Sequence, residues 1–211
     1  MLILAVSTSG SLATAALNED GNPLGIAAGA RDKRHAETLF SAIQEVFIKT
    51  GRALAEVDLL GVDIGPGSFT GVRIGVSAVN GIALALGKPV VGVDALRALY
   101  QAQAGLPGRV CILLDCGNGN GYAAQYCQGQ VIAPPEPVEA IPYLRKLPKG
   151  TALISDAGEG AAPLTPSAEW VAQAAYGLRD TALMAAKPLY LRPSQAERMW
   201  KLRQEAKGNG D

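Results

Sequence analysis

The spacing of apolar residues along the first half of the chain indicates alternating strands and helices. Three short apolar runs are typical of strands, and an Asp-Gly pair between the second and third predicts a tight hairpin turn. From Ala36 onward the apolar residues recur every three or four positions, which predicts a helix that Gly51 ends. The expected strands are residues 2–6, 12–17 and 24–28, and the expected turn is Asp20-Gly21.

A second strand and helix follow around a glycine-rich loop. We expect a strand over residues 57–64, then the loop, then a helix over residues 70–86 that stops at Gly87. A strand at residues 90–93 and a helix near residues 95–104 come next. The first half therefore predicts a βββαβα unit followed by one more strand and helix.

The second half begins with a similar pattern. It predicts an apolar strand at residues 110–114, a glycine-rich turn, a hairpin, a short helix near residues 138–146 and a strand at residues 152–154. The hairpin strands are expected at residues 122–127 and 131–133. Residues 4–7 align with residues 112–115, so a duplicated three-strand lobe is the simplest account, and chance similarity of two strands is the alternative. We expect a lobe over residues 1–104, a smaller degenerate lobe over 105–193 and a polar tail over 194–211.

Composition narrows the classes of function. The 211 residues are 48% hydrophobic and 18% charged, which is typical of a globular protein. Basic and acidic residues both number 19, so no overall positive field would attract RNA to the chain alone. No apolar run is expected to cross a membrane. Cys111, Cys116 and Cys127 lack metal or redox spacing, which favours reduced thiols in the cytoplasm.

The strongest chemical signal is the run GPGSFTGVRIG at residues 65–75, between a buried strand and a helix. Its glycines permit close backbone approach, and Ser68 or Thr70 is suited to cap the helix. Backbone amides at such a helix start also bind anions, so the candidate anion or nucleotide loop is Gly67, Ser68, Phe69 and Thr70. A capped tight turn with no ligand is an equal alternative, and the run has no Walker ending.

Taken whole, this run resembles the signature of the TsaB (YeaZ) family. The opening ILAVSTS, the HAE at residues 35–37, the KPVVGV at 88–93 and the PLYLR at 188–192 agree with it. The resemblance implies an actin-like (ASKHA) α/β fold with two ribonuclease-H-like lobes. It also implies a cytosolic complex with a TsaD-type transferase, joined by a TsaE-type ATPase, that makes threonylcarbamoyladenosine in tRNA. The chain would meet tRNA only through that complex, and whether a nucleotide lies at the partner interface stays open.

Several positions favour a non-catalytic subunit over an enzyme. Actin-like ATPases have an Asp in the first hairpin turn, and here Ser7 occupies that place, a poor Mg²⁺ ligand. Asp115 is present at the matching place in the second half, but the Arg and Glu that the family carries near residues 116–122 are missing. His35 is the only histidine and Leu39 lies four residues on, so a helical two-histidine metal site is not available. We therefore predict no catalytic residue, metal or cofactor. An autonomous actin-like ATPase or kinase is the alternative, and a protease using His35 a distant third.

Two helices offer a surface for a partner instead. Small residues recur every three or four positions in the second helix, which permits close approach of another helix. The resemblance implies that the first two helices dock onto the transferase. The predicted partner-binding residues are His35, Leu39, Phe40, Ile43, Phe47, Gly71, Gly75, Ala78 and Ile82. The alternative is that these residues belong to the core, and a homodimer of the isolated chain stays open.

Overall fold

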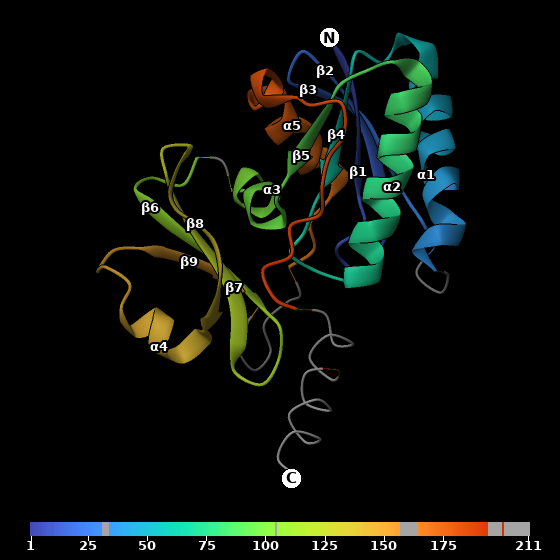
Figure 1. The fold of residues 1–211 in the computed structure, drawn as a ribbon. Coiled ribbons are helices and arrows are strands. Elements are labelled where there is room, and N and C mark those ends of the chain that lie inside the picture. The colour runs from blue at the N-terminus through green and yellow to red at the C-terminus, as the bar shows by residue number, and fades with distance from the viewer. Residues whose placement is uncertain (31–33, 104, 157–163, 194–199, 201–211) are drawn as a thin grey trace.

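The chain folds into two α/β lobes that lie side by side (Figure 1). A computed structural model describes residues 1–30, 34–103, 105–156, 164–193 and 200. One lobe contains a five-stranded sheet of order β3-β2-β1-β4-β5, and the other a four-stranded sheet of order β8-β7-β6-β9. The first four strands of each sheet share one topology, which confirms the predicted pair of actin-like lobes. The strands are β1 Leu2–Ser7, β2 Thr14–Glu19, β3 Asn22–Ala28, β4 Leu59–Asp63, β5 Val90–Val93, β6 Arg109–Asp115, β7 Asn120–Cys127, β8 Gln130–Glu139 and β9 Ala152–Ser155.

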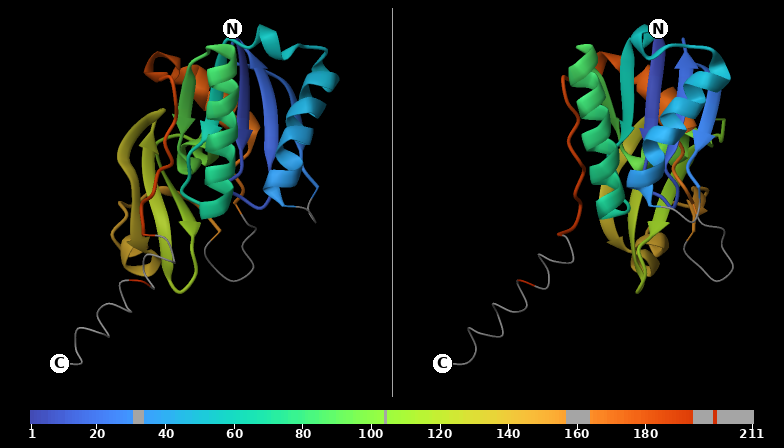
Figure 2. Two further views of the ribbon diagram at one scale, coloured as in Figure 1. Left: turned by 45° about the vertical axis from the view of Figure 1, so that its right-hand side comes forward. Right: turned by 90° about the vertical axis from the view of Figure 1, so that its right-hand side faces the viewer.

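Strand β1 forms the centre of the first lobe and is buried on both faces. Its alternate side chains enter two separate cores, because successive residues of a strand point to opposite sides. Leu4 and Val6 pack in the core beneath α1 and α2, whereas Ile3 and Ala5 pack in the core beneath α5. Figure 2 shows α1 and α2 together on one side of the sheet. The helices are α1 His35–Thr50, α2 Phe69–Leu86, α3 Ala95–Gln101, α4 Ala140–Arg145 and α5 Ala168–Gly177, with short 3-10 turns at Leu54–Glu56 and Arg179–Thr181.

The helices α3 and α5 cross between the lobes. Helix α3 follows the last strand of the first sheet, yet its Leu96 and Leu99 pack with Ile112 and Tyr126 of the second sheet. Helix α5 follows the last strand of the second sheet, yet its Val171 and neighbours pack on β1, β2 and β4. Each half of the chain therefore supplies a helix to the core of the other, and the predicted boundary at residues 104/105 stays a prediction.

Helix α2 has defined ends and one buried stripe. Ser68 caps its start by accepting a hydrogen bond from Gly71 N at 3.2 Å, and Gly87 ends it at φ 63°. By length and composition alone this helix could cross a membrane, with a mean hydropathy of 1.5, contrary to the expectation that no segment reaches such a span. Its stripe nevertheless packs on the first sheet, as does the core helix of many α/β lobes. The buried members are Gly71, Val72, Gly75, Val76, Val79 and Ala83.

Strand β8 is longer than the sequence predicts. It extends from Gln130 to Glu139 and includes Pro134, Pro135 and Pro137. Prolines are tolerated there because β8 is an edge strand and its register with β7 shifts between Ala133 and Glu136, where Pro134 and Pro135 lie. The predicted strand at residues 131–133 is thus part of a longer outer strand of the second sheet.

Candidate functional site

A cleft lies between the two lobes. It has a volume of about 330 Å³ and brings the first hairpin turn and the glycine-rich loop opposite the ends of β6 and β9. The lining residues are Ser9, Gly10, Pro66, Gly67, Ser68, Leu114, Asp115, Cys116, Tyr122, Asp156, Leu164 and Pro166. Of the four predicted loop residues, Gly67 and Ser68 line this cleft and meet Asp115 and the turn after Ser7 there, whereas Phe69 and Thr70 are not among its lining residues.

Asp63 lies behind this cleft, where its carboxylate connects the first hairpin turn to the glycine-rich loop through hydrogen bonds. The carboxylate is fully buried at the end of β4. One oxygen accepts hydrogen bonds from the hydroxyls of Ser7, at 2.8 Å, and Ser9, and the other accepts from Gly65 N at 2.8 Å. Burial raises the pKa of Asp63, while these hydrogen bonds oppose the rise. Ser7 therefore holds a carboxylate from the neighbouring strand instead of supplying one itself.

The second lobe repeats this arrangement in an exposed form. Asp115 ends β6, as Ser7 ends β1, and Asp156 directly follows β9. Asp156 Oδ1 accepts from Asp115 N at 2.7 Å, and Asp115 Oδ1 accepts from Gly117 N at 3.0 Å. Both carboxylates thus brace backbone turns. Asp63 and Asp156 were missed by the sequence analysis, although an Asp directly after a buried strand and before a glycine loop is a readable signal.

The glycine-rich loop is largely engaged with the first hairpin turn. Ser68 N donates to Ser9 O at 2.8 Å, and a side chain on Gly67 would collide with that same Ser9. Ser68 Oγ caps α2, which matches the alternative of a capped tight turn. Phe69 is half-buried and Thr70 is exposed. Anion binding by this loop stays a prediction.

The described residues give the cleft an acidic lining. Among the described residues, its ionisable lining side chains are the carboxylates of Asp115 and Asp156 together with Cys116 and Tyr122, and none is a Lys, Arg or His. Phosphoryl transfer depends on cationic groups and metals placed around the phosphates. The Asp63 oxygens already accept three hydrogen bonds in a closed position. A polyphosphate would therefore meet negative charge here without a clamp.

Asp94, at the start of α3, is a further carboxylate near the junction of the lobes. It caps α3 by accepting from Arg97 N at 2.8 Å. Burial raises the pKa of the Asp94 carboxyl to about 6, while that hydrogen bond and the Arg97 charge lower it. The native state therefore binds this proton more tightly than the unfolded chain does.

Replacing Asp94 with Asn is expected to flatten part of the pH dependence of stability. In the native protein the contribution of Asp94 is complete below the ordinary Asp pKa and is lost as pH rises through about 6. Asn still caps the helix but does not ionise. Urea unfolding from about pH 4 to pH 7 should show the wild type losing about 2 kcal/mol more than Asp94→Asn. Parallel curves for the two proteins would contradict this assignment.

Four predicted partner-binding residues are buried inside this chain. Leu39 and Ile43 lie in the core under α1, with 0% and 6% of their surface exposed. Gly71 and Gly75 face Thr8 of the first hairpin turn, whose hydroxyl donates to Gly71 O at 2.8 Å. The small residues of α2 therefore permit an internal approach, and partner binding by these four buried residues stays a prediction.

The remaining predicted residues stay on or near the surface. His35 is half-buried, and its Nε2 lies 3.1 Å from Gly10 O, so it tethers the start of α1. Phe40 is 59% exposed, and Phe47 lies two turns further along the same stripe of α1. Ala78 and Ile82 are half-buried on α2. We define Phe40, Phe47, Ala78 and Ile82 as the helical stripe.

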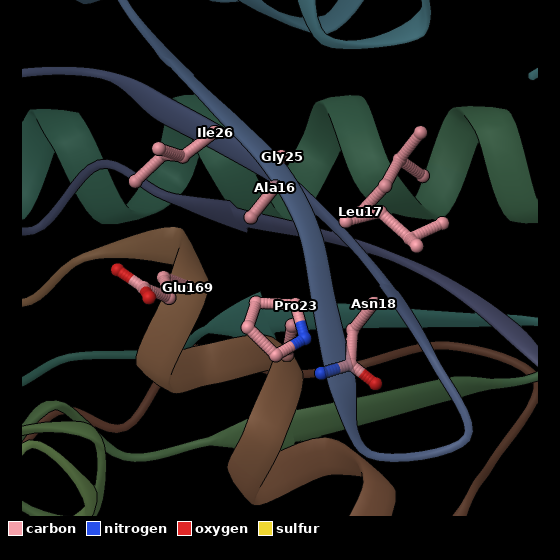
Figure 3. A pocket seen from close by; sticks show the side chains of 9 residues that line it. Ala16, Leu17, Asn18, Pro23, Gly25, Ile26 and Glu169 are labelled. Carbon is pink, nitrogen blue, oxygen red and sulfur yellow. The ribbon is translucent and has the colours of Figure 1, made fainter. Parts of the chain in front are cut away.

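A further hollow of about 140 Å³ lies between the β2–β3 hairpin and α5 (Figure 3). Its walls include Leu17, Pro23 and Ile26, and Glu169 is its one ionisable side chain. A single carboxylate among mainly apolar and backbone groups supports no chemistry that we can assign.

Comparison with known proteins identifies relatives. The model of the family described as "TsaD: tRNA N6-adenosine threonylcarbamoyltransferase" matches residues 13–173. "tRNA threonylcarbamoyladenosine biosynthesis protein TsaB" of Escherichia coli is 32% identical over 60% of this chain and 55% of its own length. A "tRNA N6-adenosine threonylcarbamoyltransferase" of Solidesulfovibrio magneticus is 34% identical over 46% of this chain and 30% of its own. The chain thus spans about half or less of these curated relatives.

A solved structure matches a larger share of this chain than these curated relatives do. "YeaZ from Pseudomonas aeruginosa" has a TM-score of 0.74 at 26% identity, and the match covers 90% of this chain and 99% of that chain. The resemblance expected from residues 65–75 is therefore confirmed by sequence and by structure.

Proposed function

Because this chain belongs to the TsaD family and resembles TsaB (YeaZ), we propose that it is a non-catalytic subunit in threonylcarbamoyladenosine synthesis on tRNA. In this role it binds and supports a TsaD-type transferase in the cytoplasm, with a TsaE-type ATPase as a further member. The observation that carries the proposal is the similarity to E. coli TsaB, whose name states a role in that biosynthesis.

The chemistry of the cleft supports a non-catalytic role. Ser7 stands where actin-like ATPases have a metal-binding Asp, and the nearby Asp63 is closed off by its three hydrogen bonds. Asp115 and Asp156 accept hydrogen bonds from backbone N–H groups, and among the described residues that line the cleft neither has a cationic partner. A subunit that lacks its own phosphoryl chemistry has to act through another protein.

The helical stripe supports a role in docking. Phe40 presents 59% of its surface to solvent, and a large exposed apolar side chain beside other apolar residues is typical of an interaction surface. Phe47, Ala78 and Ile82 adjoin the same core and extend this apolar surface over both helices. The transferase is the proposed occupant, and self-association of the isolated chain would use the same stripe.

The proposal is tested by placing a charge on the stripe. Phe40→Glu is expected to weaken binding to the TsaD-type transferase by about 30-fold, since a buried aromatic anchor typically contributes that much. Cells that express only this variant should lose most threonylcarbamoyladenosine from tRNA, measured by nucleoside mass spectrometry. Because Phe40 is already exposed, the fold should be preserved.

Ile141→Glu is the matched control. Ile141 is 61% exposed on α4 of the other lobe, so it introduces the same charge at equal exposure. Binding and modification should stay at the wild-type level in this variant. Normal tRNA modification after complete depletion of the chain would refute the proposed function, whatever the variants do.

A further inference from the structure

Two arginines and two aromatic rings line a cavity beside the start of α2, together with Leu191, Pro193 and Trp200, and Tyr122 lines a smaller cavity next to it. We define the cationic furrow as Phe69, Arg73, Tyr122, Tyr190 and Arg192. The Phe69 and Tyr190 rings stack with centroids 4.5 Å apart. The Arg73 guanidinium lies 4.1 Å from the Phe69 centroid, and its Nε donates to the Tyr190 hydroxyl at 2.8 Å. Arg192 lies 5.4 Å from the Tyr122 centroid and donates to Asn120 Oδ1 at 3.3 Å.

The furrow carries positive charge without a counterion. Among the described residues, the ion pairs involve neither Arg73 nor Arg192. The cavity beside them has a volume of about 540 Å³, and none of its lining residues in the described part of the chain is an Asp or Glu. Tyr190 is 45% exposed, so part of an aromatic surface lies open between the two guanidinium groups. This combination is complementary to a ligand with planar rings and negative charge.

The furrow adjoins the cleft between the lobes. A small cavity next to it shares Tyr190 and Arg192 on one side, and shares Gly67 and Tyr122 with the cleft on the other. The C-terminal segment, orange to red in Figure 1, descends beside α2 toward β7, and its residues from Tyr190 to Pro193 line the larger cavity. The connecting cavity holds only about 30 Å³, so the ligand that we consider lies in the larger cavity beside Arg73 and Tyr190 and does not enter the acidic cleft.

We propose that the cationic furrow binds a short single-stranded RNA segment. Its bases stack beside Tyr190, and its phosphates pair with Arg73 and Arg192, which is how single strands are held without sequence preference. The zero net charge of the chain means that this attraction is local, so the contact is weak and salt-dependent. The furrow does not include the helical stripe. RNA contact by this chain itself goes beyond the proposed function and does not depend on it.

Binding of the full chain to a labelled single-stranded RNA oligonucleotide, followed by fluorescence anisotropy, tests the proposal. With two phosphate contacts the slope of log affinity against log salt should be about −1.4, and Arg73→Gln or Arg192→Gln should reduce it to about −0.7. Tyr190→Ala should weaken binding by about tenfold, the typical loss of one stacked base. The matched control is Arg179→Gln, because Arg179 also lies over a tyrosine ring, at 4.9 Å from the Tyr176 centroid, but outside the furrow.

Several results would overturn the proposal. These are no binding by the wild-type chain at low salt, equal binding by Arg73→Gln and Arg192→Gln, or equal loss in Arg179→Gln. Equal competition by free AMP would indicate a mononucleotide site, and equal competition by an RNA duplex or by an acidic peptide would indicate a different class of ligand. Unfolding temperatures of each variant separate lost contacts from lost structure. None of these outcomes changes the test of transferase docking.

Discussion

Asp63→Ala is expected to lower the free energy of unfolding by about 4 kcal/mol. The substitution leaves three buried donors without their acceptor: the hydroxyls of Ser7 and Ser9 and the Gly65 amide. Ser7 Oγ also lies 3.1 Å from Pro166 O, so the same site connects β1, β4, the glycine loop and the segment before α5. Urea denaturation near neutral pH measures the loss directly.

Asp115→Ala is the matched control for this variant. Asp115 occupies the equivalent strand end of the second lobe, but it is exposed and water can replace it as the acceptor for Gly117 N. We expect its loss to stay below about 1 kcal/mol. Equal destabilisation by the two substitutions would show that burial of the Asp63 network is not what stabilises the lobe.

Gly71→Ala is expected to destabilise the protein by about 3 kcal/mol. A Cβ at Gly71 would fall well inside contact distance of Thr8 O, and a backbone carbonyl cannot rotate away. At Gly75 the nearest atom would be Thr8 Oγ1, a side-chain atom that is able to move, so Gly75→Ala should cost less. Thermal and urea unfolding of the two variants give the order.

Gly81→Ala is expected to change the stability of the protein in the opposite direction, although Gly81 lies on the same helix. No atom lies within 4 Å of a Cβ built there, and alanine favours a helix interior by about 1 kcal/mol over glycine. Gly81→Ala should therefore stabilise the protein. If all three variants behaved alike, the close approach of α2 to the first hairpin turn would not be the reason for its glycines.

Local sequence signals were sufficient to predict most elements. The ends of α1 and α2 follow from Gly51 and Gly87, which adopt the left-handed conformation that the sequence predicts for a helix stop. The strand at Val90–Val93 is predicted with its observed ends. These features depend on residues that adjoin them in the chain, so a single sequence contains the necessary information.

Features set by tertiary contacts were harder to predict. Leu39 and Ile43 share helical spacing with Phe40, so periodicity alone could not separate the core face of α1 from its exposed flank. The sequence analysis made no prediction of α5, although Ala168, Val171, Ala172 and Ala175 recur at helical spacing. Its packing on the other half of the chain depends on contacts with strands more than a hundred residues away, such as β1.

The reciprocal placement of α3 and α5 has a mechanical consequence. Separating the two lobes would remove Leu96 from the core of the second lobe and Val171 from a core of the first. The apolar surface exposed in this way costs about 25 cal/mol of free energy for each Å². A hinge motion that opens and closes the cleft, as in an ATPase that binds and releases a nucleotide, is therefore energetically costly in this molecule. Its outer faces keep fixed relative positions, which suits a rigid template on which other molecules are aligned.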